Sequence, residues 1–431
     1  MKNLRTLVLA PGSNPDSSST ALVGYAHSEA LARIHAVTLV AQGCHEAAFR
    51  RKPGPFHAIE TINTPWLDRI YAWIIRRILK GDYGSHLLTA LSYPFCVVFE
   101  WKAWRLLRPR IMAGEFDVVL RLLPVVPTLP SPFAYFLRHG PIPFVIGPIN
   151  GGLPWPQGFS QAEKQKEWVS NLRNVYRILP FSRSTFRNAK AIIAGSSQTY
   201  AEFAAYREKL FFVPENGLSQ SLLNLASPKV PGQGHLELIY VGRLVPYKAC
   251  DLAIRAAAPL LQKGLARLTI VGYGPERQGL EQLAQTLGVA KDILFVGRLS
   301  HREAMLSLQK ADVLVFPSIR EFGGGVVFEA LAMGVVPVVA DFGGPGDIVH
   351  SGVGYKVALT NESDMVCQIE KILSELAGDR DLLDRLRQEG MKYAREALSW
   401  DGKAQVITQI LFWAVGKGTK PDLLPPKALL S

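Results

Sequence analysis

Cysteine is scarce in this sequence of 431 residues: four occur, at positions 44, 96, 250 and 367. They are far apart, and none forms a Cys-x-x-Cys pair or a cluster with histidine, so the sequence supports neither a disulfide framework nor a zinc site. Scattered, unpaired cysteines are typical of a protein of the reducing cytoplasm, so we expect a cytoplasmic location.

Long apolar runs are also missing. The most apolar stretch, residues 87–99, contains Pro94 and is about 13 residues long, whereas a membrane-spanning helix needs about 20. The first apolar run, residues 4–10, stops at Pro11-Gly12 and predicts a buried strand rather than a signal peptide. We therefore expect neither a transmembrane segment nor a targeting segment.

Acidic residues are scarce only in the first half of the chain. Residues 1–220 carry 25 Lys and Arg against 14 Asp and Glu, a net charge of +11, whereas residues 221–431 carry 23 against 22, a net charge of +1. A basic half fits nucleic acid, an anionic membrane surface or an acidic substrate, and it also fits an ordinary solvated face.

Short apolar runs alternate with longer amphipathic stretches, in two series. Continuous apolar strands alternating with helices are typical of parallel sheets covered on both faces. The length and the pattern together predict an α/β protein with two doubly wound, Rossmann-like domains. The expected strands are residues 4–10, 36–41, 118–122, 144–146 and 191–194, then 236–241, 268–271, 293–296, 313–316 and 336–339.

The domain boundary is expected where periodicity is lost. Residues 219–235 contain Pro, Gly and polar residues without a repeating pattern, and we interpret them as a linker between domains at 1–218 and 236–399. Residues 415–431 are expected to form a poorly ordered tail.

Two cations follow the strand expected at 236–241. Arg243 and Lys248 lie after Gly242, in the loop before a helix that we expect Asp251 to cap. Doubly wound domains bind ligands outside the carboxyl ends of their strands, where arginine grips phosphate oxygens and lysine acts as a point charge. The loop predicts an anion site, although two solvated surface cations would give the same pattern.

A glycine-rich loop follows the strand expected at 313–316. Glycines at 323–325 precede a helix, so backbone N–H groups would lie at the positive end of the helix dipole and bind an anion or hydroxyl groups. Glu321 lies in this loop and Glu329 lies about one turn into the helix, a spacing that lets both carboxylates point toward the same crevice. Carboxylates beside a phosphate site commonly accept hydrogen bonds from sugar hydroxyls.

In this order the motifs resemble the donor half of the family 4 retaining glycosyltransferases, which are two-domain GT-B enzymes that use a nucleotide-diphosphate sugar. The resemblance covers about residues 190–345 and is specific because five spaced elements agree. The matching segments are Gly242-Arg243-Leu244-x-x-x-Lys248, Gly272-Tyr273-Gly274-Pro275, Phe295-Val296-Gly297-Arg298, Glu321-x7-Glu329 and Gly343-Gly344-Pro345.

The resemblance implies a GT-B fold with a central cleft and a last helix, about residues 400–414, that folds back on the N-terminal domain. It implies that Arg243, Lys248 and Glu321 are the catalytic residues: the two cations would hold the diphosphate and Glu321 the transferred sugar. The remaining donor contacts implied are Gly242, the backbone of Arg298 and Leu299 at the base edge, the amides of Phe322, Gly323, Gly324 and Gly325 at the sugar, and Glu329 at the ribose.

The acceptor side is less well defined. Many family members have a histidine at the end of an N-domain strand where this chain has Arg121, which either replaces the histidine or is structural. A rigid Gly- and Pro-rich segment at 147–156 follows another strand, and Asn150 is its expected polar contact, with Gly12 on the same side.

Other motifs fit less well. Gly272-Tyr273-Gly274 lacks the G-x-G-x-x-G spacing of dinucleotide-binding folds, and residues 379–381, which resemble a D-x-D metal motif, are expected to be the first turn of a helix. With two cations supplying positive charge, we expect no metal and no cofactor. The neutral second half, without alternating aromatic and basic residues, argues against nucleic acid.

We therefore expect a retaining, hexosyltransferase-type glycosyltransferase that uses a UDP- or GDP-sugar and a glycan or lipid-diphosphate-linked acceptor, in cell-surface polysaccharide or glycolipid biosynthesis. A non-catalytic sugar-nucleotide-binding scaffold and a GT-B sugar-nucleotide epimerase are the alternatives. The +11 half would be the acceptor domain, which favours peripheral contact with the anionic inner face of a membrane. The amphipathic residues 65–80 would either lie in that interface or cover the sheet as an ordinary helix.

Overall fold

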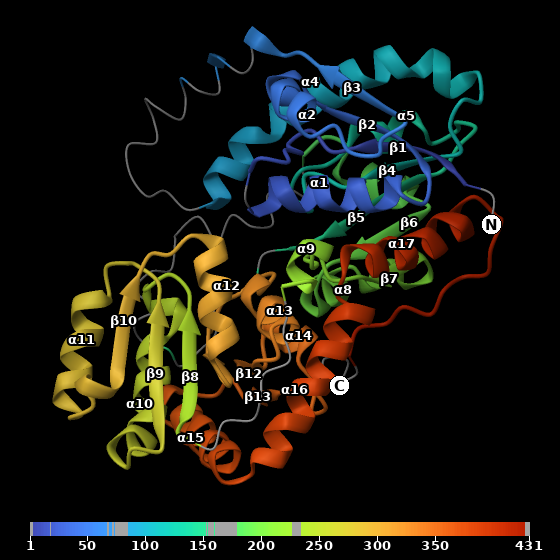
Figure 1. Cartoon of the computed structure of the whole chain (residues 1–431). Helices are drawn as coiled ribbons and strands as arrows, with labels where there is room; N and C mark the ends of the chain where they lie inside the picture. Colours follow the sequence, from blue (N-terminus) through green and yellow to red (C-terminus); the bar gives the residue numbers. More distant parts are fainter. Residues whose placement is uncertain are drawn as a thin grey trace. The chain divides into compact units, whose positions relative to one another are not determined.

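The computed structural model describes residues 3–17, 19–66, 69–70, 73, 85–151, 153, 159, 179–225 and 234–426. These residues form two units, each with its own parallel sheet (Figure 1). Unit 1 comprises Met1–Gly152, Glu167–Glu215 and Trp400–Ser431, and unit 2 comprises Leu153–Lys166 and Asn216–Ser399.

Unit 1 contains a seven-stranded sheet of order β3-β2-β1-β4-β5-β6-β7, in which all neighbouring strands run parallel. Its strands are β1 (Arg5–Leu9), β2 (Ala36–Gln42), β3 (Ala58–Ile62), β4 (Val118–Arg121), β5 (Phe144–Ile149), β6 (Ala191–Ala194) and β7 (Leu210–Phe212). Its α-helices are α1 (Ser19–Ala32), α2 (Glu46–Arg51), α4 (Ser85–Met112), α5 (Pro132–Phe136), α7 (Ser182–Asn188), α8 (Ser197–Glu202) and α17 (Trp400–Ala414).

Helices cover both faces of this sheet because its strands are apolar on both sides. Along β1, Val8 packs in one core with residues of α1 and α17, whereas Leu7 and Leu9 pack in a second core with residues of α4 and α5. This double burial explains why the strands appear in the sequence as continuous apolar runs rather than alternating ones.

Unit 2 contains a six-stranded parallel sheet of order β10-β9-β8-β11-β12-β13. Its strands are β8 (Leu236–Val241), β9 (Ala266–Val271), β10 (Ile293–Gly297), β11 (Val313–Phe316), β12 (Val336–Ala340) and β13 (Tyr355–Val357). Its α-helices are α9 (Gln220–Leu223), α10 (Cys250–Gln262), α11 (Arg277–Thr286), α12 (His301–Lys310), α13 (Gly325–Ala332), α14 (Gly343–Ile348), α15 (Glu362–Gly378) and α16 (Arg380–Glu396).

The prediction that Asp251 caps the helix after β8 is wrong. Helix α10 begins at Cys250, and its N-cap is Ala249, which lies two residues before Asp251. Ala249 has φ 51° and ψ 42° and makes no side-chain cap bond. This left-handed conformation costs an alanine about 1–2 kcal/mol relative to glycine. The turn after Lys248, rather than a capping side chain, therefore determines where α10 starts.

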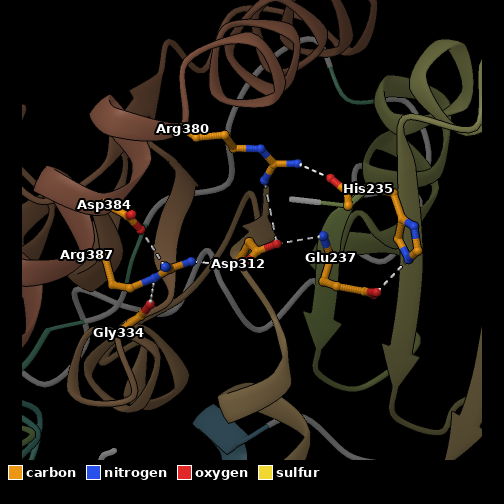
Figure 2. Close-up of polar contacts among 8 residues, drawn as sticks. His235, Glu237, Asp312, Gly334, Arg380, Asp384 and Arg387 are labelled. Atoms are coloured by element: carbon orange, nitrogen blue, oxygen red, sulfur yellow. Dashed lines mark hydrogen bonds and ion pairs between the residues drawn. The ribbon is translucent and has the colours of Figure 1, made fainter. Parts of the chain in front are cut away.

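The amino-terminal edge of the unit 2 sheet carries a network of charged side chains (Figure 2). Arg387 of α16 is 5% exposed, and its guanidinium contacts Asp312 at 2.9 Å, Asp384 at 2.6 Å and the carbonyl oxygen of Gly334 at 2.9 Å. Asp312 also accepts a hydrogen bond from the backbone N–H of Glu237, the second residue of β8, at 2.9 Å. The network ties α16 to the ends of β8, β11 and α13.

Residues 379–381 lie at the start of a helix, as expected. Asp379 is the N-cap of α16, where its carboxylate accepts a hydrogen bond from the Leu382 N–H at 2.8 Å. Arg380 contacts Asp312 at 3.8 Å and donates to the Gly234 carbonyl at 2.7 Å, which places it in the network of Figure 2.

Helix α17 packs on α1 within unit 1. Its Lys403 is 2% exposed and donates a hydrogen bond to the Pro214 carbonyl at 2.8 Å. Burial lowers the pKa of this ammonium group to about 7, against the opposing influence of Glu215. Lys403 thus joins α17 to the chain segment at which unit 1 continues into unit 2.

Two segments expected to lack structure make packing contacts. Helix α9 lies inside the expected linker, and its Leu222 and Leu223 are buried in the core of unit 2. Beyond α17, the Leu423 carbonyl accepts a hydrogen bond from the Phe212 N–H at 2.9 Å. In both segments leucine side chains pack against apolar residues that are distant in the sequence.

No helix among the described residues has the length and hydropathy needed to cross a membrane. Most of the amphipathic stretch predicted at 65–80 lies outside the described residues, which include only 65–66, 69–70 and 73 of it.

Candidate functional site

The candidate donor residues lie at the carboxyl-terminal edge of the unit 2 sheet, where several strands lead into loops. Gly242, Arg243 and Lys248 follow β8, and Arg298 and Leu299 follow β10. The loop from 317 to 324 follows β11 and leads into α13. Since β8 and β11 are neighbours in the sheet, their loops meet directly.

The cationic loop after β8 is built around Tyr247. The hydroxyl of Tyr247 accepts a hydrogen bond from the Arg243 guanidinium, and the Lys248 ammonium lies 5.7 Å from the centre of the Tyr247 ring. The same ammonium lies 5.5 Å from the ring of Phe316, the last residue of β11. Aromatic faces attract cations, so the two rings hold Lys248 at the end of the strands.

Lys248 and Glu321 form an ion pair that joins the two loops. Their side chains are 13% and 19% exposed, so the pair is shielded but open to a ligand. Burial, together with the positive charge of Arg243, lowers the pKa of Lys248 to about 8. The predicted residues of the two motifs, 73 positions apart, are thus brought into direct contact.

The glycine-rich loop presents the amino terminus of α13. Gly324 is the N-cap and has φ +57°, a conformation that glycine adopts without strain. Its N–H donates to the Glu321 carboxylate at 3.4 Å. The loop rests on α14, where a side chain at Gly343 would collide with the Glu321 carbonyl and one at Gly344 with the Phe322 carbonyl. The paired glycines at 343–344 therefore provide the space for the loop.

The G-x-G motif after β9 has a packing role. A side chain at Gly272 would collide with the Gly242 carbonyl, and one at Gly274 with the Leu244 carbonyl. The two loops also share a hydrogen bond from the Leu244 N–H to the Tyr273 carbonyl at 2.9 Å. These glycines allow the backbone of the loop after β9 to pack directly against the backbone of the cationic loop.

Glu329 extends from α13 toward α12. Its Oε1 accepts a hydrogen bond from Nε2 of His301 at 2.8 Å, and its side chain is 22% exposed. The hydrogen bond to Glu329 raises the pKa of His301, while burial acts in the opposite direction. The guanidinium of Arg298 lies 5.0 Å from the centre of the half-exposed Tyr273 ring.

The three acceptor-side candidates all lie at the carboxyl ends of neighbouring strands of unit 1. Arg121 ends β4, but its side chain is fully buried, where it pairs with Glu100 at 2.7 Å and donates to the Leu129 carbonyl at 2.8 Å. This pairing favours the structural alternative for Arg121. Asn150, after β5, is 4% exposed and accepts a hydrogen bond from Ser196 at 2.8 Å, whereas Gly12, in the turn after β1, is half-buried.

Sequence reasoning missed three side chains that border the site: Tyr247, Tyr273 and His301. Tyr247 stands beside Lys248 inside the matched motif, so its position was available from the sequence. His301 follows the expected base-edge residues by two positions, and its pairing with Glu329 depends on how α12 and α13 pack.

Comparison with known proteins gives the family that unit 2 resembles. Residues 228–393 match the model of the family described as Glycosyl transferases group 1. The matched residues lie within unit 2, which is therefore similar to a group 1 glycosyl transferase domain. The family resemblance expected from the motifs is thus confirmed at this level.

Curated relatives match over the same region. They include an uncharacterised glycosyltransferase of Methanocaldococcus jannaschii, 31% identical over 40% of this chain and 44% of its own, and the glycogen synthase of Mycobacterium tuberculosis, 32% identical over 45% of both chains. The D-inositol 3-phosphate glycosyltransferase of Nocardia farcinica is 34% identical over 39% of each chain. The chain spans less than half the length of these relatives.

Solved structures match across both units. HepE of Anabaena, solved with UDP, covers 95% of this chain and 99% of its own with a TM-score of 0.60 at 16% identity. Sucrose-phosphate synthase of Thermosynechococcus elongatus gives the same coverages and TM-score at 17% identity. The expected GT-B fold class, with two Rossmann-like domains, is confirmed.

Proposed function

We propose that the protein is a retaining glycosyltransferase that moves a sugar from a UDP- or GDP-sugar to a hydroxyl group of a glycan or a lipid-diphosphate-linked glycan. The observation that carries the proposal is the Lys248–Glu321 pair beside the amino terminus of α13. It combines a cation for a diphosphate, a carboxylate for sugar hydroxyls and backbone amides for either.

In the proposed reaction the bond between the sugar and the diphosphate breaks first, through an oxocarbenium-like transition state. Negative charge then grows on the leaving diphosphate, which Lys248, Arg243 and the loop amides stabilise without a metal ion. A phosphate oxygen takes the proton of the acceptor hydroxyl, and the acceptor oxygen bonds to the sugar on the same face. Configuration is therefore retained.

The relatives support a nucleotide-sugar donor. HepE has been solved with UDP, with UDP and glucose, and with UDP-glucose. The curated relatives include a glycogen synthase and D-inositol 3-phosphate glycosyltransferases. We assign this chain to the same reaction class, glycosyl transfer, on the basis of its own motifs.

The proposal is tested by donor binding followed by turnover. A UDP- or GDP-sugar at 100 times its Kd is expected to stabilise the folded protein by about 2.7 kcal/mol, which a thermal-shift screen detects. Release of free UDP or GDP from the stabilising donor, with transfer to a glycan or lipid-linked acceptor, is the expected activity. Binding without any turnover would support the scaffold alternative, and an isomerised donor in the absence of acceptor would support the epimerase.

A basic, partly apolar stripe on α4 supports contact of unit 1 with an anionic membrane. Trp101, Arg105, Arg108 and Met112 recur every three or four residues along the exposed side of this helix, whose opposite side is buried in the core. Trp101 is 45% exposed and Met112 60%, and the Arg105 guanidinium lies 4.9 Å from a Trp101 ring. Apolar and cationic side chains on one helix face are typical of interfacial binding.

Replacing both Trp101 and Met112 by glutamate is expected to weaken binding to vesicles of equal parts phosphatidylglycerol and phosphatidylcholine at least fivefold. The change removes apolar contacts and adds charge that the anionic surface repels. Sedimentation with vesicles measures the binding, and Leu265→Glu, at an exposed leucine of unit 2, is the control. Equal binding of the double variant and the wild type, or equal binding to neutral vesicles, would contradict membrane contact through α4.

A further inference from the structure

The carboxylate of Glu329 has one occupied and one unoccupied oxygen. Oε1 accepts the hydrogen bond from His301, whereas Oε2 has no hydrogen-bond partner among the described residues. The side chain is one-fifth exposed, so the carboxyl group is not enclosed in the core.

His301 is well placed to hold Glu329 still. It is the first residue of α12, directly after the N-cap Ser300, which forms a capping box with Glu303. In that box the Glu303 carboxylate accepts hydrogen bonds from the backbone N–H of Ser300 at 2.8 Å and from its hydroxyl at 2.6 Å. The backbone that carries the imidazole is therefore anchored on both sides.

The chemistry of the pair suits this arrangement. The raised pKa of His301 increases the share of the imidazolium form, in which both ring nitrogens carry protons and Nε2 donates to the carboxylate. A hydrogen bond between charged partners is shorter and stronger than a neutral one. Glu329 is thereby oriented before any ligand arrives, while its second oxygen stays free to accept.

We propose that His301 is a positioning residue for nucleotide binding, which holds Glu329 so that its free oxygen accepts a hydrogen bond from a ribose hydroxyl. The inference rests on the proposed function, because it takes the ligand of this edge of the sheet to be a nucleoside diphosphate. A flexible glutamate would lose side-chain freedom on binding, and His301 removes that cost in advance.

Isothermal titration calorimetry with UDP and GDP tests the proposal on the full chain. His301→Ala is expected to raise the Kd of the nucleotide that the wild type binds by about 5- to 10-fold. His301→Gln places an amide N–H near the position of Nε2 and should restore most of the affinity. His301→Asn places its amide near Nδ1 instead, out of reach of Glu329, and should behave like alanine.

The decisive comparison uses the 2′,3′-dideoxy form of the same nucleotide, which lacks the ribose hydroxyls. If His301 acts through Glu329 on those hydroxyls, His301→Ala should leave the Kd of the dideoxy nucleotide unchanged. It should also add nothing to the loss caused by Glu329→Ala. These results together would establish the positioning role.

Equal losses for the ribose and dideoxy nucleotides would overturn the inference, as would equal affinities of the Gln and Asn variants. Both outcomes leave the proposed function standing, because the wild type binds nucleotide in either case. Failure of the wild type to bind UDP and GDP would instead overturn the proposed function and the inference with it.

Discussion

Replacing Lys248 by alanine is expected to lower the kcat of sugar transfer by about 100- to 1,000-fold. The ammonium group lies beside Arg243 and is paired with Glu321, at the point where we place the leaving diphosphate. Charge on the diphosphate grows in the transition state, so a preorganised cation there acts on the chemical step more than on donor binding. Steady-state kinetics with a UDP- or GDP-sugar measures the effect.

Lys263→Ala is the matched control for Lys248. Lys263 is an exposed lysine that follows α10 in the same unit, at the opposite end of the sheet. Its removal should leave kcat within twofold of the wild type. If Lys248→Ala retained full turnover while remaining folded, the assignment of the diphosphate site to the loop after β8 would be wrong.

Replacing Arg387 by methionine is expected to lower the free energy of unfolding by about 3–5 kcal/mol. The substitution keeps an unbranched, apolar stem, but it leaves the buried Asp312 carboxylate and the Gly334 carbonyl without the guanidinium that contacts both. Urea denaturation, followed by circular dichroism, measures the change.

Arg385 offers the matched control on the same helix. It is exposed, two residues before Arg387, and Arg385→Met should change the unfolding free energy by less than about 0.5 kcal/mol. Adding Asp312→Asn to Arg387→Met should cost less than the sum of the two single changes, because the pair acts as one unit. Equal effects of the two arginine variants would show that the network of Figure 2 contributes little stability.

The two predictions concern opposite ends of one sheet. Lys248 lies at the carboxyl ends of β8 and β11, whereas Arg387 contacts Asp312, which lies just before β11 and accepts a hydrogen bond from Glu237 near the amino-terminal end of β8. The site thus rests on strands whose far ends are fixed by buried charges. We therefore expect substitutions at the Arg387 end to change mainly the free energy of unfolding, and substitutions at the Lys248 end to change mainly kcat.

Much of unit 2 could be predicted from local patterns. The strands expected at 236–241 and 313–316 coincide with β8 and β11, and the glycine-rich loop lies where the motif placed it. Such features depend on neighbours within a few residues, since apolar runs, glycines and helix starts act locally. The short edge strands β3, β7 and β13 were missed. A strand of three to five residues without a strong apolar pattern is too short to be distinguished from a loop in the sequence.

The start of α10 shows the limit of local reasoning. Aspartate is a favoured N-cap, and nothing in the sequence around Asp251 argues against that role. The structure begins the helix earlier because Ala249 takes up a left-handed turn that points Lys248 toward Glu321. The geometry of the site, rather than capping preference, decides the boundary.

By itself the sequence determined the two doubly wound domains, the order of the motifs along the second domain and the imbalance of charge between the halves. Only the tertiary structure decided which side chains meet: Lys248 with Glu321, His301 with Glu329, Arg387 with Asp312, and Arg121 with Glu100. The physical reason is that parallel sheets are assembled from segments far apart in the chain. Strand order and helix packing determine these contacts, and neither can be predicted from a local pattern of residues.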